Sequence, residues 1–114
     1  MTISTLLTQL NEDATLIQFS DVIQVIEDAY KYTPTSFHNG DTFNQAGTNE
    51  GSCKLFYFAK LNNLPEAQTV ALFGDYYRKD VLQNPDGSDH ANIRNFMRSG
   101  WAGVKFEGEA LSAL

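Results

Sequence analysis

Cys53, the single cysteine of this 114-residue chain, is the residue best suited to nucleophilic chemistry. It follows Gly51-Ser52 at the expected start of a helix, and a helix N-terminus lowers the pKa of a thiol. With His38 or His90 as a base and a nearby acid, Cys53 supplies the residue types of a cysteine-dependent enzyme. Free cysteine is also among the most buried residue types, so the favoured interpretation of Cys53 is a packing residue. A small cysteine-dependent enzyme is kept as an alternative.

Cysteine and histidine are also metal ligands, but their spacing in this chain does not match a metal-binding motif. His38, Cys53 and His90 are the only residues of these two types. No two of them have the CxxC or HxxxH spacing of common zinc sites. A Gly-rich phosphate-binding loop is absent as well. The sequence therefore predicts no metal site and no cofactor.

Cationic and aromatic residues gather in the last third of the sequence. Arg94 and Arg98 stand four residues apart on one expected helix, with His90 one turn earlier. Like charges at this spacing repel each other by a few tenths of a kcal/mol, so negative groups must compensate them. The chain's own acids, such as Asp75 or Asp80, are one source, and an external carboxylate, phosphate or acidic partner surface is the other. For an external ligand, tyrosine and tryptophan add flat apolar contact, and the predicted binding residues are Tyr77, Arg78, His90, Arg94 and Trp101.

Helices are expected to position most of these residues, because apolar side chains recur at helical spacing along much of the chain. Ser20 and Ser88 are the residue type of an N-cap, while Pro65 and Gly74 are placed to open and close one helix. Leu55–Ala59 has no polar face, which predicts a central helix surrounded by protein. The expected helices cover residues 3–10, 21–31, 52–59, 65–73, 76–84 and 89–99.

Two segments depart from the helical pattern. Residues 33–51 are rich in glycine and asparagine, which are typical of turns and caps. Phe37 and Phe43 are expected to pack beneath this long irregular segment. Residues 104–106 alternate like a short strand that can pair with residues 36–39.

The chain is long enough for one hydrophobic core, and its 42% hydrophobic content exceeds that of a disordered chain. We expect a mainly α single domain over residues 1–114, with about five or six short helices and room for one small two-stranded β-ribbon (α+β). The aromatic residues predicted to share its core are Phe56, Phe58, Phe73, Phe96 and Trp101.

Charge and composition exclude several classes of partner. The net charge is −6, and residues 1–50 carry seven acids and one base. Such a chain repels nucleic acid, because neutralisation of phosphates supplies most non-specific affinity. No stretch approaches the roughly 18 apolar residues of a membrane span, and the N-terminus lacks the features of a secretory signal. We expect no nucleic-acid partner, no membrane association and synthesis in the cytoplasm.

Several short blocks carry a resemblance to a known family. The blocks are Thr33-Pro34, Phe37 with Asn39-Gly40, Gly51-Ser52-Cys53-Lys54, Phe73-Gly74, Tyr76-Tyr77-Arg78, Asp80-Val81-Leu82, Pro85 with Gly87, His90, Asn92-Ile93-Arg94 and Gly100-Trp101. In this combination the chain resembles the HopJ family, named for a type III effector of plant-pathogenic bacteria, from end to end. The resemblance implies a bacterial protein with a link to type III secretion into host cells and to virulence. It implies no particular enzymatic activity or ligand, because none is established for the family.

The resulting functional hypothesis is a non-catalytic binding or interaction module. Its expected partner is a host or bacterial protein, and a small anionic ligand or metabolite is the alternative, beside the enzyme based on Cys53 with His90 or His38.

Overall fold

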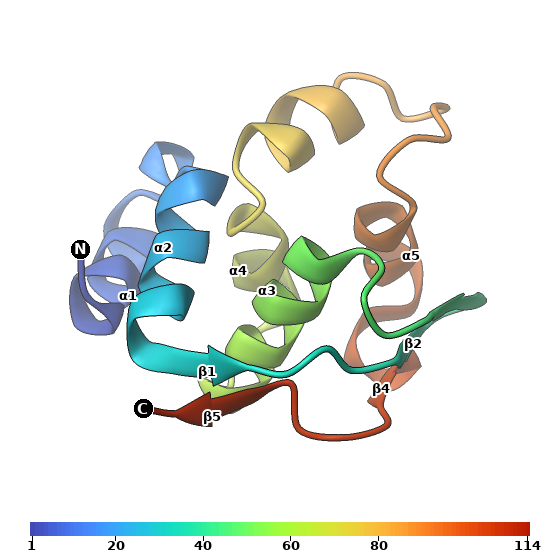
Figure 1. The fold of residues 1–114 in the computed structure, drawn as a ribbon. Helices are drawn as coiled ribbons and strands as arrows, with labels where there is room; N and C mark the ends of the chain where they lie inside the picture. Colours follow the sequence, from blue (N-terminus) through green and yellow to red (C-terminus); the bar gives the residue numbers. More distant parts are fainter.

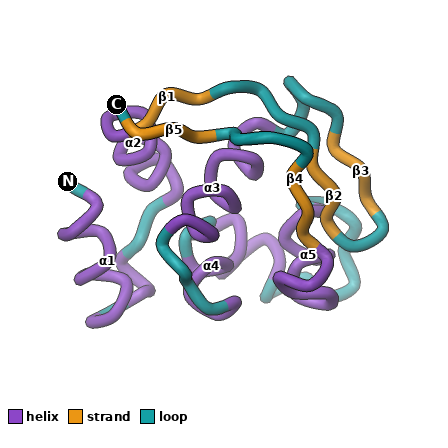
Figure 2. Tube along the Cα trace, turned by 90° about the horizontal axis from the view of Figure 1, so that it is seen from below, coloured by secondary structure: helices purple, strands orange, loops and turns teal.

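Helix α3 (Glu50–Leu61) lies at the centre of the fold, as its lack of a polar face predicts. In this computed structural model, which describes residues 1–114, every residue from Leu55 to Ala59 is buried. Helices α1 and α2 cover one side of α3 and helix α5 the other, while short strands run along one end of the molecule (Figure 1). Figure 2, turned by 90°, shows β1 and β5 on the side of α2 and the other three strands on the side of α5, with α3 between them.

The N-terminal layer contains α1 (Ile3–Glu12), the 3₁₀ turn η1 (Ala14–Leu16) and α2 (Phe19–Ala29). Helix α2 begins one residue before Ser20, and its N-cap, Gln18, makes no side-chain capping bond. The prediction of Ser20 as N-cap is therefore wrong. Aromatic packing holds this end of α2 instead, because the Phe19 ring stacks on Phe73 with centroids 6.0 Å apart.

Pro65 and Gly74 bound the next helical region as predicted. Helix α4 (Glu66–Ala71) follows Pro65, and Gly74 takes a positive φ of 62°. A Cβ atom at Gly74 would lie 2.9 Å from the backbone nitrogen of Phe19, so only glycine fits. The following helix is a single π-helical stretch, η2 (Tyr76–Val81), and is shorter than the predicted helix over residues 76–84.

Helix α5 (Ala91–Ser99) begins after His90, which has a left-handed conformation with φ 51°, so the prediction of Ser88 as N-cap is wrong. Gly100 ends the helix as predicted, and Ile93 and Phe96 are buried. Met97, whose spacing from Ile93 and Phe96 predicts an inward position, instead has 48% of its surface exposed, so that prediction is wrong. Helix α5 also buries Asn92 and Asn95, whose side chains hydrogen-bond residues of the neighbouring strands. The face that carries Met97 is therefore turned toward solvent.

Two small antiparallel sheets complete the fold. One pairs β1 (Tyr30–Tyr32) with β5 (Leu111–Ala113), and the other has the order β3-β2-β4. Strands β2 (Phe37–Asn39) and β4 (Val104–Phe106) pair with Phe37 opposite Phe106. This pairing confirms the predicted ribbon, which is extended by a third strand, β3 (Thr42–Asn44). The short 3₁₀ turn η3 (Gly100–Gly103) links α5 to β4.

Strand geometry explains why one expected core residue is exposed. Successive side chains on a strand point to opposite faces, and Phe37 and Asn44 occupy the inner face. Phe43, paired with His38, therefore lies on the outer face with 52% of its surface exposed. The expectation that Phe43 packs beneath this segment is wrong.

The predicted aromatic residues do share one core. The ring centroid of Phe56 lies 5.4 Å from that of Phe73 and 5.0 Å from that of Phe96. Trp101 packs edge-on against Phe96 at 5.0 Å, and Phe58 is fully buried in the same cluster. The expected mainly helical α+β fold is thus confirmed. None of its helices combines the length and the hydropathy that crossing a bilayer requires.

Replacing Phe56 or Phe96 by alanine is expected to lower the free energy of unfolding by roughly 3 to 5 kcal/mol, because each leaves a cavity in the core. Phe43→Ala serves as the matched control and should change stability by less than about 0.5 kcal/mol, since Phe43 is on the surface. Urea denaturation measures all three variants. An unchanged midpoint for Phe56→Ala would show that the core lies elsewhere.

Candidate functional site

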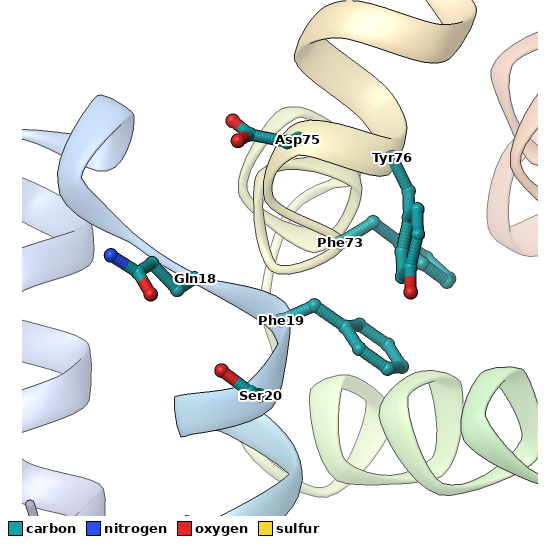
Figure 3. A pocket seen from close by; sticks show the side chains of 6 residues that line it. All are labelled: Gln18, Phe19, Ser20, Phe73, Asp75 and Tyr76. Atoms are coloured by element: carbon teal, nitrogen blue, oxygen red, sulfur yellow. The ribbon is translucent and has the colours of Figure 1, made fainter.

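Two adjoining hollows share three aromatic residues and bring together several of the sequence blocks that resemble the HopJ family. Both are lined by Phe19, Phe73 and Tyr76, and each has a volume of about 240 Å³. We call this surface the aromatic groove. The first hollow is completed by polar residues from the start of α2 and the start of η2, shown in Figure 3, namely Gln18, Ser20 and Asp75. The second is completed by Asn49, Gly51, Ser52, His90, Asn92 and Ile93.

Glycine at two positions gives the aromatic groove its shape. A Cβ atom on Gly51 would lie 3.0 Å from the Phe19 ring, so the first turn of α3 can approach that ring closely. The positive φ of Gly74 turns the chain between Phe73 and Tyr76. As a result the Tyr76 ring stands edge-on to Phe19, with centroids 5.2 Å apart, and 45% of the Tyr76 surface is exposed.

The second hollow also lies at the N-termini of two helices. Helix α3 starts after Asn49 and α5 after His90, and neither N-cap side chain accepts a bond from the first turn. Helix N-termini carry partial positive charge and free N–H groups, which favour anions. Glu50, the acid in the first turn of α3, is exposed and does not line the hollow. The groove therefore combines flat apolar surface with groups that attract a negative charge.

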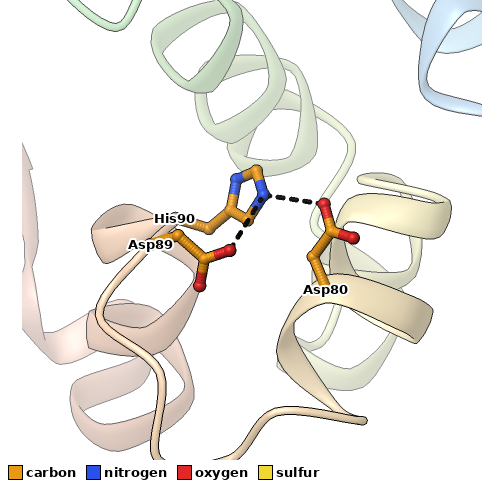
Figure 4. Close-up of side chains that lie close together, drawn as sticks. All are labelled: Asp80, Asp89 and His90. Atoms are coloured by element: carbon orange, nitrogen blue, oxygen red, sulfur yellow. Dashed lines mark hydrogen bonds and ion pairs between the residues drawn. The ribbon is translucent and has the colours of Figure 1, made fainter.

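His90 separates the aromatic groove from a pair of acids. Its ring lies 5.1 Å from that of Tyr76, and its Nε2 atom is 3.0 Å from Asp80 Oδ2 and 3.8 Å from Asp89 Oδ2 (Figure 4). Asp89 directly precedes His90 in the sequence, whereas Asp80 is ten residues earlier. The Pro85-Asp86-Gly87 turn between the two helical segments brings residue 80 opposite residue 90.

A buried network of asparagines fixes the second hollow. Asn92 and Asn44 exchange two side-chain hydrogen bonds of 3.0 and 3.1 Å, and Asn39 donates to the Asn92 carbonyl at 2.8 Å. Asn49 donates to Asn44 Oδ1 at 2.8 Å. The network ties the start of α5 to the β2–β3 hairpin and to the start of α3. These asparagines are expected from the sequence to be turn and cap residues. Asn49 does occupy the N-cap position of α3, and the network in addition holds the two helix N-termini together.

Cys53 does not have the surroundings of a nucleophile. Only 1% of its surface is exposed, and its Sγ donates to the Thr35 carbonyl at 3.5 Å. Burial raises the pKa of the thiol, so the expected lowering by the helix N-terminus is wrong. His38 is on the outer face of β2 beside Glu107, and His90 is held by the acids described above, so neither histidine contacts Cys53. The geometry supports a packing role.

The five predicted binding residues do not line one groove. Arg78 donates to the carbonyls of Ala14 and Ile17 at 3.1 and 2.6 Å, which locks η2 onto the η1–α2 connection. Trp101 donates to the Leu64 carbonyl at 2.9 Å, and Tyr77 is half-buried against the core. Of the five, only His90 lines the aromatic groove. A binding role for the other four stays a prediction.

Arg94 is compensated by the chain itself. Its Nε and Nη2 atoms donate to the carbonyl and Oδ1 of Asp89, both at 2.6 Å, and Nη1 donates to the Asn84 carbonyl at 2.9 Å. The partner is thus Asp89 rather than Asp75 or the side chain of Asp80. This hydrogen bond from Arg94 lowers the pKa of the Asp89 carboxyl. Arg94 therefore holds the loop between η2 and α5 in place.

Comparison with known proteins gives a family and a structural neighbour. A family model described as HopJ type III effector protein matches residues 3–111. A solved structure entitled "Crystal structure of unknown function protein VPA0580" superposes with a TM-score of 0.98 at 47% sequence identity, covering 100% of this chain and 95% of that one. A search of the curated proteins found no match.

Arg94→Gln is expected to destabilise the fold by roughly 2 to 4 kcal/mol, because it leaves several loop carbonyls without their charged donor. Arg98→Gln, on the exposed side of the same helix, is the control and should cost less. Thermal and urea unfolding measure the difference. Equal stability of the two variants would mean that the loop contacts of Arg94 contribute nothing.

The stability at low pH should report on Asp89. The pKa of Asp89 is lowered in the folded state. Asp89 therefore contributes to the free energy of unfolding above its unfolded-state pKa, and this contribution is lost as the pH falls through its folded-state pKa. NMR titration of the carboxyl should show a pKa below the usual 3.8, returning toward it in Arg94→Gln. A carboxyl that titrates normally in the wild-type protein would rule out this pairing.

Alkylation of Cys53 should be slow in the folded protein, because burial raises its pKa and closes off the sulfur. A raised thiol pKa stabilises the folded state below the unfolded-state pKa, and this stabilisation is lost as the pH rises through the folded value. Intact mass after iodoacetamide treatment measures the rate, with urea-unfolded protein as the positive control. Rapid labelling of the folded protein at about pH 6.5 would instead indicate a stabilised thiolate.

Proposed function

Because this chain belongs to the HopJ type III effector protein family, we propose that it acts as a non-catalytic binding module whose ligand occupies the aromatic groove. One observation carries the proposal: the groove joins the exposed rings around Phe19 and Tyr76 to two helix N-termini without side-chain caps. Binding sites are commonly concave and apolar, with a few polar groups that orient the ligand. The groove has these properties.

The ligand chemistry follows from the two parts of the groove. Phe19 and Tyr76 offer partly exposed rings to a flat apolar group, and the buried Phe73 ring supports Phe19 from the core side. The first turns of α3 and α5 offer N–H groups and partial positive charge to a carboxylate or phosphate. We infer a ligand that carries an aromatic or similarly flat group next to an acidic group. Such chemistry is found in free metabolites and in acidic, aromatic-containing segments of a partner protein.

The blocks that carry the family resemblance support this location. Gly51-Ser52, Phe73-Gly74, Tyr76, His90 and Asn92-Ile93 are far apart in the sequence, yet they contribute to the aromatic groove or to its turn. Other blocks lie outside the groove, because Arg78 holds η2 against the η1–α2 connection and Trp101 packs against Phe96. The blocks that do meet at the groove support a binding surface there.

The family description also supports a place of action. We propose that the protein is made in the bacterial cytoplasm and transferred through a type III system, so that its partner is a host protein or a bacterial one encountered before transfer. The net charge of −6 disfavours nucleic acid as the partner.

A ligand screen by NMR tests the groove directly. We expect aryl phosphates and aromatic carboxylates to shift the amide signals of Gly51, Ser52, Asn92 and Ile93, because these first-turn groups face the acid. Tyr76→Ala should weaken the interaction by about tenfold, since it removes one wall of the groove. Phe43→Ala, an exposed aromatic residue on β3, should leave it unchanged.

Two results distinguish the sources of the ligand. Competition by the free aryl compound against a captured partner protein would identify an acidic aromatic segment of that partner. Binding of the aryl compound alone, with no competing protein, would identify a metabolite. The proposal would be contradicted if the amide signals that shift all belonged to residues outside the groove. Equal losses of binding affinity in Tyr76→Ala and Phe43→Ala would also contradict it.

A further inference from the structure

Three potential metal ligands converge beside the aromatic groove from two different elements. They are Nε2 of His90 and one carboxylate oxygen each of Asp80 and Asp89, and all three atoms lie within 4.8 Å of one another (Figure 4). We propose that these residues form a binding site for a divalent transition-metal ion of the zinc class. This inference does not rest on the proposed function, because it needs no organic ligand in the groove.

The distances are close to those of a tetrahedral site. Zinc bonds of about 2.0 to 2.2 Å place two ligand atoms roughly 3.3 to 3.6 Å apart. The two distances from His90 Nε2, 3.0 Å to Asp80 and 3.8 Å to Asp89, lie on either side of this value. The two carboxylate oxygens are at most 4.8 Å apart, and both aspartates are about half exposed, so small side-chain rotations suffice to close the site.

Arg94 prepares one ligand without competing for the same atom. It binds Asp89 Oδ1 at 2.6 Å, whereas Oδ2 is the oxygen that faces His90 at 3.8 Å. Such a bond to the outer oxygen orients a metal-binding carboxylate in the same way as the outer hydrogen bonds of known sites. Arg94 also lies 3.4 Å from the Asp80 carbonyl, so it fastens both ligand-bearing segments together.

The ligand set indicates which ions fit. Calcium and magnesium favour oxygen ligands alone, whereas an imidazole nitrogen with carboxylates suits zinc and its neighbours. With a neutral imidazole, two carboxylates and one guanidinium, the cluster has a charge of −1, which a divalent cation reverses. Three protein ligands leave a coordination position for water or for an anionic group. Because His90 also lines the aromatic groove, this ion lies next to the groove.

Zinc titration of the full chain tests the site. Calorimetry of chelator-treated protein should show one Zn²⁺ bound per chain, and Co²⁺ should give the visible absorption of a tetrahedral nitrogen–oxygen site. His90→Gln and Asp80→Asn should each weaken binding by about tenfold or more. His38→Gln is the matched control, because His38 is the other histidine and pairs only with Glu107, at 3.8 Å. Its affinity should equal that of the wild-type protein.

A second measurement does not depend on the folding of the variants. Mn²⁺ added to the wild-type protein should broaden the amide signals nearest Asp80, Asp89 and His90 before any others. The proposal is overturned if no binding is seen up to about 1 mM metal, if His90→Gln binds as well as the wild type, or if broadening centres on other acids. In each of these cases the cluster is an ion pair that joins η2 to α5.

Discussion

Enclosure of α3 is the constraint on which the rest of this structure depends. Helix α3 is buried on all sides over Leu55–Ala59, so the other elements must pack around it and exclude water from it. Helices α1 and α2, the pair α4 and α5, and the strands each cover part of its surface (Figure 1). A chain this short supplies those walls only by using very short elements, and their ends therefore meet close to the start of α3. The aromatic groove is formed where those ends meet.

Polar contacts add to the aromatic packing of Phe19 on Phe73 in holding that region in place. The asparagine network joins α5 to the β2–β3 hairpin, Arg78 holds η2 against the η1–α2 connection, and Arg94 holds the loop that follows η2. Each of these side chains hydrogen-bonds backbone or amide groups of another segment, so it joins two elements that are separate in the sequence. The groove walls are thereby fixed relative to one another without adding apolar area. A site built in this way needs little rearrangement to bind a ligand.

Sequence reasoning predicted the elements whose signals are local and missed those decided by distant contacts. The apolar spacing around Leu55–Ala59 and the positions of Pro65, Gly74 and Gly100 predicted α3 and the ends of two helices correctly. The two predicted caps failed for different reasons. Ser88 is not a cap because His90, in a left-handed conformation that has no clear local pattern, directly precedes α5, and Ser20 is not a cap because α2 already begins at Phe19, after an extended Gln18. At the candidate site, the long side chain of Arg78 hydrogen-bonds a carbonyl of a distant segment, which no local pattern predicts. At Cys53, burial raises the thiol pKa by more than the helix N-terminus lowers it. Only the turn at Pro85 linked Asp80 to His90 in the sequence.

The two sheets give this mainly helical protein the folding kinetics of a more complex topology. Strand β1 pairs with β5, and β2 with β4, so each pairing joins segments separated by more than half of the chain. Closing such a long loop lowers the chain entropy before the hydrogen bonds between the strands can form. Helical proteins without such distant pairings fold much faster for this reason. The helices around α3 can collapse early, but the strands that cover it must wait for the last part of the chain to dock. The slowest step of folding is therefore the one that seals the central helix.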